Sequence, residues 1–165
     1  MATKMTTPQT DIALTSPAFR FGERIPTEYT ADGRNVSPPL KWDGVPAGAK
    51  SLALICEDPD APKGTFAHWV AFNLPADTME LGEGVPAREA LPDGTGQGVN
   101  GFGKPGYGGP SPPAGKPHRY VFHLYALDDK LDLPAGATRE QVTGAMKGHI
   151  LGQGELTGSY GRPAA

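Results

Sequence analysis

The chain has 165 residues and a net charge of −3, and it contains no cluster of lysine and arginine, so no nucleic-acid-binding surface is expected. No stretch approaches the roughly 20 apolar residues of a membrane-spanning helix, and the single cysteine, Cys56, excludes an internal disulfide and a cysteine-based zinc site. The 23 glycines and 18 prolines alternate with short apolar runs, which favours a loop-rich all-β domain over a disordered chain.

The N-terminal stretch is polar. Residues 1–11 contain no apolar segment and are predicted to form a flexible tail, followed by a single domain over residues 12–165. A secretory signal would need an apolar segment, so the protein is expected in the cytoplasm. Weak strand patterns then occur near Ala13–Leu14, Phe19–Phe21 and Glu28–Thr30.

Three apolar runs predict the principal strands. Ser51–Asp58 and His68–Leu74 are each followed by a proline and have the length of a buried strand rather than of a helix. His118–Leu127 shows the clearest alternation of the three. Two of the predicted strands therefore begin with a histidine, and the other ends with an aspartate.

Alternation along each strand predicts which side chains share a face. On this pattern the polar residue at the end of each strand lies on an apolar face. The expected faces are Leu52, Leu54, Cys56 and Asp58 in the first strand, His68, Val70, Phe72 and Leu74 in the second, and His118, Tyr120, Phe122, Leu124 and Ala126 in the third.

The segment Gly82–Pro117 is too rich in glycine and proline to form one regular element, and loops of this length are usually functional or disordered. After it, one short helix is predicted. Thr138 and Gln141 have the spacing of a capping box, and apolar residues recur at helical spacing up to Met146. A last strand is expected near Leu156–Tyr160.

No helical pattern separates the strong strands, so a parallel sheet with crossover helices is not expected. The predicted fold class is therefore all-β: an antiparallel β-sandwich with Greek-key-like connections and one or two short helices.

Four polar side chains form the candidate site: Asp58, Asp60, His68 and His118. The prolines of the stretch DPDAP restrict the backbone, so the two carboxylates lie on a stiff loop at the end of a strand. If the three strong strands are neighbours, their ends bring all four side chains to one small mouth. The glycine-rich segment leads directly into His118, and its backbone N–H groups can approach a ligand there.

Such a group suits a small anion. Histidine N–H groups would donate to a phosphate or carboxylate oxygen, while the aspartates would fix the histidine tautomers and favour the charged rings. A zwitterionic headgroup, with phosphate and ammonium, would also satisfy both signs of charge.

Simpler interpretations remain open. The DPDAP stretch can be only a turn, and a histidine on an apolar face can be a core residue whose hydrogen bonds are satisfied. A centre of two histidines and one carboxylate for a metal is conceivable by ligand type, but no metal-binding spacing supports it. No activated serine or cysteine is evident for nucleophilic catalysis. His123, on the face opposite His118, and His149, on the apolar face of the helix, are interpreted as structural.

The chain contains three motifs: DPDAP with the following HWV, GYGGPSPPAGKPHRY, and the upstream DGRNVSPPLKW. Together they resemble the phosphatidylethanolamine-binding protein family, also called Raf kinase inhibitor proteins. The resemblance extends from about residue 12 to the C-terminus, and the proline-rich loop is similar to that of the bacterial and archaeal branch. It implies a β-sandwich with a small anion-binding cavity at one end. The site residues it implies are Asp58, Asp60, Pro62, His68, Gly109, Pro110, Pro112, His118 and Tyr120.

The expected function is non-enzymatic binding of a small anion or phosphorylated headgroup, such as phosphate or a phosphoethanolamine-like group, without a cofactor or a metal. One alternative is inhibition of a protein kinase or serine protease through surface loops, and a third, less favoured one is a metal-dependent hydrolase. The resemblance to bacterial members also implies a homodimer.

Overall fold

The computed structural model describes residues 10–163. Most of the expected tail, residues 1–11, lies outside that range, and its last two residues form a strand. The strands are β2 (Thr10–Asp11), β3 (Ala13–Thr15), β4 (Leu40–Asp43), β5 (Ser51–Asp58), β6 (Phe66–Pro75), β7 (Glu80–Leu81), β8 (Gly96–Gln97), β9 (His118–Leu127) and β10 (Ile150–Tyr160), and the helices are η1 (Thr27–Tyr29), a 3-10 turn, and α1 (Arg139–Met146).

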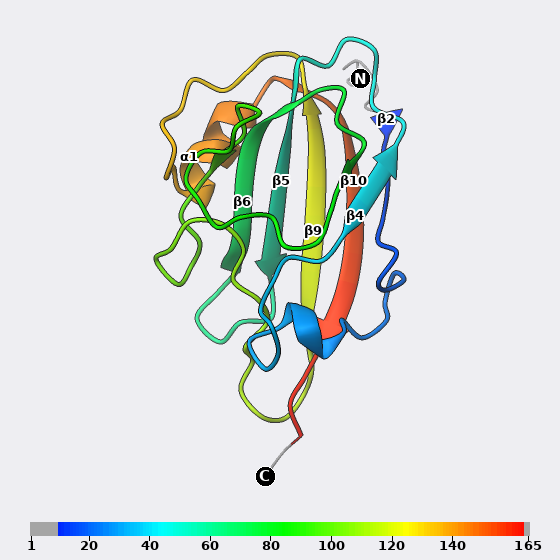
Figure 1. Cartoon of the computed structure of the whole chain (residues 1–165), viewed down its shortest axis with the longest axis vertical. Coiled ribbons are helices and arrows are strands. Elements are labelled where there is room, and N and C mark those ends of the chain that lie inside the picture. The colour runs from blue at the N-terminus through cyan, green and yellow to red at the C-terminus, as the bar shows by residue number, and fades with distance from the viewer. Residues whose placement is uncertain (1–9, 164–165) are drawn as a thin grey trace, which may run out of the picture.

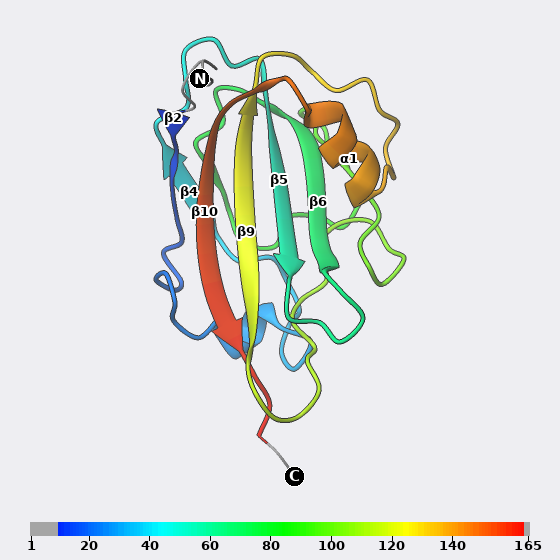
Figure 2. The ribbon, with the colours of Figure 1, turned by 180° about the vertical axis from the view of Figure 1, so that it is seen from behind.

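The strands form two sheets. The larger has the order β2-β10-β9-β5-β6-β8, and the smaller has the order β3-β4-β7. All of these pairings are antiparallel except that of β2 with β10. The small sheet lies in front of the large one in Figure 1, and the view from behind in Figure 2 shows the large sheet with α1 beside β6. The predicted all-β class, an antiparallel sandwich with a short helix, is confirmed.

The three strongest predicted strands are neighbours at the centre of the large sheet, in the order β9-β5-β6. Because β5 runs antiparallel to both neighbours, its last residues lie beside the first residues of the other two. Asp58 pairs with Phe66, and Glu57 pairs with Val121. One end of the sheet, the lower end in Figure 1, therefore carries Asp58 together with the starts of β6 and β9.

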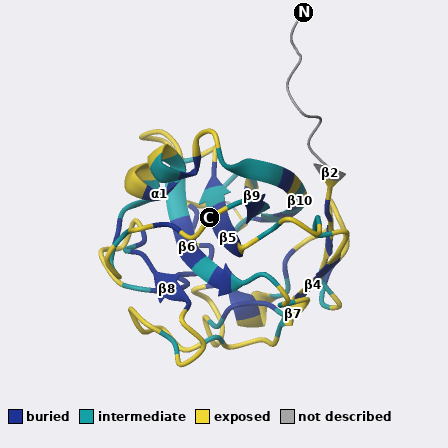
Figure 3. Ribbon diagram, turned by 90° about the horizontal axis from the view of Figure 1, so that it is seen from above, coloured by how far each residue is buried: buried dark blue, intermediate teal, exposed yellow. Residues whose placement is uncertain are grey.

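Apolar side chains fill two cores, one on each face of the large sheet. The core between the sheets is one cluster, with members from Ile12 near the start of the described chain to Tyr160 near its end. The core under α1 is a smaller cluster. In Figure 3 the buried stretches lie in the interior and the exposed loops surround them. Strand β5 is buried along most of its length because each of its faces contributes to one of these cores.

Two β-bulges in β6 overturn the predicted faces of that strand. Between Leu52 and Leu54 of β5, and again between Cys56 and Glu57, the partner strand advances by one extra residue. Asn73, within the first bulge, has φ of 58°. Each bulge reverses the alternation, so Val70 and Phe72 pack under α1, whereas Leu74 packs between the sheets.

The short, weak patterns were less accurate than the strong ones. Phe19–Phe21 forms no strand, and most of Glu28–Thr30 forms the 3-10 turn η1, in which the Tyr29 N–H donates to the Pro26 carbonyl. Strands β4, β7 and β8 were not expected, and β8 lies inside Gly82–Pro117, the segment predicted not to form one regular element. These strands are two to four residues long, too short to show a period of their own.

The predicted capping box of α1 is confirmed. The Thr138 hydroxyl accepts a hydrogen bond from the Gln141 backbone, and the Gln141 side chain accepts one from the Thr138 backbone. The expected position of His149 was wrong, because the helix ends at Met146. His149 lies in the following turn, where its Nδ1 is 2.7 Å from a carboxylate oxygen of Asp128.

Candidate functional site

A small cavity opens where the end of β5 and the starts of β6 and β9 meet. Its volume is about 140 Å³, which suits a compact group rather than a drug-sized ligand, whose sites have about 300 Å³ or more. The residues that line it are Asp58, Ala61, Pro62, Phe66, His68, Phe102, Ser111, Pro112, Pro113, His118 and Tyr120. We call this space the anion cavity. Six of the residues proposed from the sequence are among them.

Asp58 and His118 form a buried pair across β5 and β9. Oδ2 of Asp58 is 2.7 Å from Nδ1 of His118, and their side chains are only 5% and 11% exposed. A carboxylate can only accept, so Nδ1 of His118 carries the proton and Nε2 is left for a ligand. The other carboxylate oxygen accepts the Asp60 backbone N–H at 2.8 Å. Both oxygens of Asp58 are therefore engaged, and its role is to orient His118.

His68 enters the cavity from the bulged start of β6. Its Nδ1 is 2.6 Å from the Gly108 carbonyl oxygen, which can only accept, so this nitrogen carries the proton of the neutral ring. Burial lowers the pKa of His68, although the hydrogen bond to Gly108 acts in the opposite direction. A neutral His68 has no second N–H, so its Nε2 accepts a hydrogen bond. The expected role of donor would require a protonated ring.

Tyr120 lines the same cavity, and its hydroxyl is buried and has no hydrogen-bond partner among the described residues. Tyr120 is 1% exposed, and its ring lies edge-on to His68 with centroids 5.2 Å apart. Burial raises the pKa of this hydroxyl, and the nearby Asp58 carboxylate raises it further, so it remains protonated and can donate. A buried hydroxyl without a partner costs about 1–3 kcal/mol. The Tyr120 hydroxyl is thus a buried donor in the site that still needs a hydrogen-bond acceptor.

Asp60 lies next to the cavity but is not part of its lining. Its Oδ2 accepts the backbone N–H of Arg119 at 2.9 Å, and the guanidinium of Arg119 donates to both carboxylate oxygens at 3.0 and 2.9 Å. Asp60 thus fastens the DPDAP loop to the start of β9, whereas the sequence predicted that it would orient a histidine. Arg119 points to the opposite face from His118, so the pattern of apolar faces gave no reason to consider it.

We expect the Asp60–Arg119 pair to make stability dependent on pH in acid. Hydrogen bonds from Arg119 lower the pKa of Asp60 from 3.8 to about 2. Because the folded-state pKa lies below the unfolded one, the pair contributes stability above pH 4 that is lost as the pH falls toward 2. Titration of the Asp60 carboxyl by NMR should show a higher pKa in Arg119→Gln, whereas the exposed control Arg88→Gln should leave it unchanged. An identical Asp60 titration in both variants would contradict this role of Arg119.

The proline-rich loop forms one wall, with a register different from the one expected. Ser111, Pro112 and Pro113 line the cavity, whereas Gly109 and Pro110 lie outside its lining. The Gly109 N–H donates to the Asn35 side chain, and the Pro110 carbonyl accepts the Ala31 N–H. A Cβ atom at position 109 would lie 2.6 Å from the Tyr29 carbonyl oxygen, so glycine there permits close packing on the chain rather than on a ligand.

Aromatic rings supply the part of the site that the sequence did not predict. Phe66 and Phe102 line the cavity with ring centroids 4.9 Å apart, and both pack against His68. The position of Phe66, two residues before His68, was a usable signal, because residues two apart in a strand share a face. Phe102 comes from the glycine-rich segment, where no periodic pattern could indicate it.

The C-terminal end of β10 supports the same wall. The Arg162 guanidinium donates to the Pro112 carbonyl at 3.0 Å and forms an ion pair with Asp32 at 2.8 Å. The Tyr160 hydroxyl donates to the same carboxylate at 2.6 Å. This network joins the wall of the cavity to the end of the chain and to the loop after η1.

Within residues 10–163, no group of three or more histidine, cysteine, aspartate or glutamate side chains is placed to hold a metal ion. No helix in this range combines the length and the apolar character that crossing a membrane would require.

Known proteins resemble this chain in sequence and in structure. An UPF0098 protein of Methanothermobacter thermautotrophicus is 57% identical over 149 residues, which are 90% of this chain and 98% of that protein. An UPF0098 protein of Aquifex aeolicus is 48% identical over 89% of this chain and 86% of its own length. A crystal structure of a phosphatidylethanolamine-binding protein homolog from Chlamydia trachomatis has 42% identity and a TM-score of 0.83, covering 93% of this chain and 99% of that one.

The structure of Escherichia coli YbcL, described as a member of the mammalian phosphatidylethanolamine-binding protein family, has 34% identity and a TM-score of 0.85. The structural match covers 92% of this chain and 99% of the YbcL chain. The family model for phosphatidylethanolamine-binding protein matches residues 15–161, nearly all of the described range. This chain belongs to the phosphatidylethanolamine-binding protein family.

Proposed function

We propose that the protein binds a compact anionic group, of the phosphate or phosphomonoester type, in the anion cavity and does not transform it. The observation that supports this proposal most directly is that Tyr120 lines the cavity and that its buried hydroxyl has no partner among the described residues. A ligand oxygen that accepts from this hydroxyl removes the cost of leaving it unpaired. The cavity volume of about 140 Å³ suits a group of this size.

Four polar residues of the lining, Asp58, His68, His118 and Tyr120, have distinct roles in this proposal. Tyr120 donates to one phosphate oxygen, and Nε2 of His118 donates to another when the ring is protonated, with Asp58 holding that ring in place. Nε2 of neutral His68 accepts a hydrogen bond from the hydroxyl group of a singly protonated phosphate. The three groups together recognise an oxyanion that still carries one proton.

Titration calorimetry with inorganic phosphate and with phosphoethanolamine tests the proposal. Removing a hydrogen bond to a charged group costs about 1.5–3 kcal/mol, so His118→Ala is expected to weaken both affinities by roughly ten- to hundredfold. His149→Ala is a matched control, because His149 also pairs with an aspartate at 2.7 Å but lies at the opposite ends of β9 and β10.

Equal affinities of wild type and His118→Ala would refute the assigned site. Phosphorus NMR of the phosphoethanolamine sample after a day with the protein should show it unchanged, and release of inorganic phosphate would refute the non-enzymatic part of the proposal.

A further inference from the structure

A second cavity adjoins the anion cavity. Its volume is about 350 Å³, within the range of small-molecule sites. We call it the Lys104 groove, and its lining residues are Asn35, Ala87, Asn100, Phe102, Lys104, Pro105, Tyr107 and Gly108. Phe102 lines both this groove and the anion cavity. The Phe102 ring is therefore part of the wall of both spaces.

Phe102 and the Gly108 backbone link the walls of the two spaces. The Phe102 ring lies on Gly108, where a Cβ atom would be only 2.6 Å from the ring. On its other side, the Gly108 backbone pairs with His68 by donating its N–H to the His68 carbonyl at 2.8 Å and by accepting from the imidazole. Phe102 is 47% exposed, so its outer edge forms a rim between the two spaces rather than a seal.

The groove offers a largely apolar surface, and two of its polar side chains already have partners. Asn100 accepts from the Phe102 N–H and donates to the Gly106 carbonyl, and the Tyr107 hydroxyl donates to the Tyr29 carbonyl. The other lining residues are Asn35, whose side-chain oxygen accepts the Gly109 N–H, together with Ala87, Phe102, Lys104, Pro105 and Gly108.

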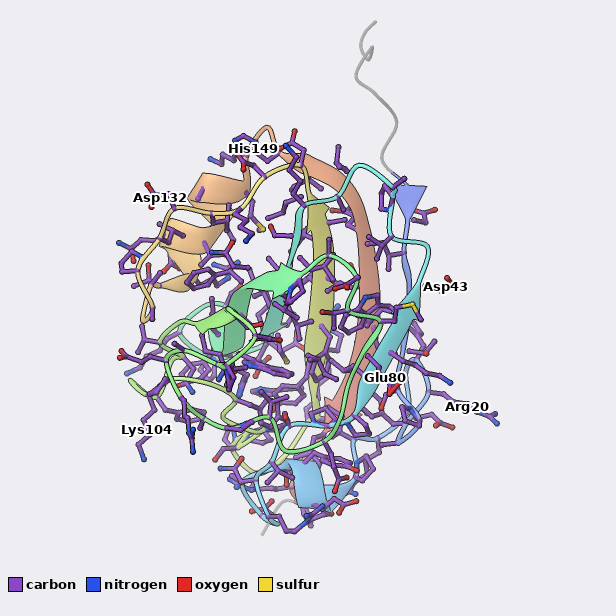
Figure 4. All side chains as sticks on the ribbon, turned by 45° about the horizontal axis from the view of Figure 1, so that its top comes forward. Arg20, Asp43, Glu80, Lys104, Asp132 and His149 are labelled. Carbon is purple, nitrogen blue, oxygen red and sulfur yellow. The ribbon has the colours of Figure 1, made fainter. Side chains whose placement is uncertain are left out.

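Lys104 is the one charged residue in the lining of the groove. Its ammonium group forms no ion pair within residues 10–163. Figure 4 shows Lys104 at the edge of the molecule, away from the core. An apolar groove that ends in an unpaired cation suits an organic group with a negative charge at its far end.

We infer that the Lys104 groove binds the organic part of a phosphomonoester whose phosphate occupies the anion cavity, and that this part is an aromatic or similarly flat apolar group ending in a carboxylate. This inference rests on the proposed function. The anion cavity has room for little more than the phosphate, so the ester substituent must leave through its mouth. Phe102 lines both the anion cavity and the groove and is partly exposed, so its ring is available for stacking on a substituent that passes from one space to the other.

Calorimetric titration with four ligands tests the inference: inorganic phosphate, phenyl phosphate, 4-carboxyphenyl phosphate and 4-carbamoylphenyl phosphate. The last two differ in the charge of the distal group and little in shape. Both aryl phosphates with a distal group should bind more tightly than inorganic phosphate. Exposed ion pairs have small energies, so the carboxylate should bind about two- to fivefold more tightly than the amide.

Two variants of exposed residues localise the effect. Lys104→Gln should abolish the preference for carboxylate over amide and leave the affinity for inorganic phosphate unchanged, whereas the distant control Lys147→Gln should preserve it. Ala87→Trp should fill the groove and reduce the affinity for the aryl phosphates to that for inorganic phosphate.

The outcomes separate the two proposals. If inorganic phosphate binds but all four ligands bind equally, or if Lys104→Gln retains the preference for the carboxylate, the groove inference is wrong and the proposed function stands. If neither inorganic phosphate nor any aryl phosphate binds, the proposed function fails and the groove inference fails with it.

Discussion

Replacing Tyr120 with phenylalanine is expected to stabilise the free protein while weakening its binding of phosphate. The hydroxyl is buried without a partner among the described residues, so its removal should raise the free energy of unfolding by about 1–3 kcal/mol. The same change removes a donor to the bound anion and should lower the affinity for phosphate by roughly tenfold or more, since such hydrogen bonds contribute about 1.5–3 kcal/mol. Urea denaturation in phosphate-free buffer and titration calorimetry measure the two effects.

Tyr107→Phe is the matched control for this prediction. Tyr107 is also buried, but its hydroxyl donates to the Tyr29 carbonyl at 2.6 Å. Removing that donor leaves a carbonyl unpaired, so Tyr107→Phe should destabilise the protein and leave the affinity for inorganic phosphate unchanged. If Tyr120→Phe lowers the free energy of unfolding as Tyr107→Phe does, the Tyr120 hydroxyl has a partner in the free protein and the main support for the proposed function is lost. Opposite signs of the two stability changes would support a functional hydroxyl kept at a cost in stability.

Trp69→Ala is expected to have the largest effect on stability. Trp69 is fully buried between the sheets, and removing such a side chain costs about 3–5 kcal/mol, a large share of the 5–15 kcal/mol that is typical for a domain. Its indole N–H also donates to the Gln97 side chain at 2.8 Å. The Gln97 amide in turn donates to the carbonyls of Pro86 and Arg88, so the tryptophan holds part of the long glycine-rich segment.

Trp69→Phe separates packing from hydrogen bonding at this position, and Phe21→Ala is a control at an exposed aromatic side chain. Trp69→Phe keeps much of the apolar volume but leaves the Gln97 side-chain oxygen without its donor. This unpaired oxygen should lower the free energy of unfolding by about 1–3 kcal/mol. Phe21→Ala, at a side chain that is 69% exposed, should change the free energy of unfolding by less than about 0.5 kcal/mol. Chemical denaturation measures all three variants, and a similar small loss in each would mean that the core does not depend on Trp69.

The sequence alone determined the features that depend on residues close together in the chain. The apolar runs at β5 and β9 gave both strands with their correct ends, because alternation and flanking prolines are local signals. The capping box at Thr138 placed the start of α1 for the same reason. The sequence placed Asp58 at the end of one strand and His118 at the start of another, and the family motifs indicated the other members of the site. That the two side chains meet depended on β5 and β9 being neighbours, which the structure shows.

Only the tertiary structure decided how the remaining residues contribute. An inserted residue in β6 reverses the alternation of its side chains, and a bulge has no signature in one sequence, so the face of His68 relative to Val70 and Phe72 could not be predicted. Phe102 reaches the anion cavity, and Lys104 reaches the Lys104 groove, from a segment whose path is set by glycine turns and by contacts distant in the chain. The missing partner of the Tyr120 hydroxyl is likewise a property of the assembled cavity, because hydrogen bonding depends on which atoms lie nearby in space and not on the order of the residues.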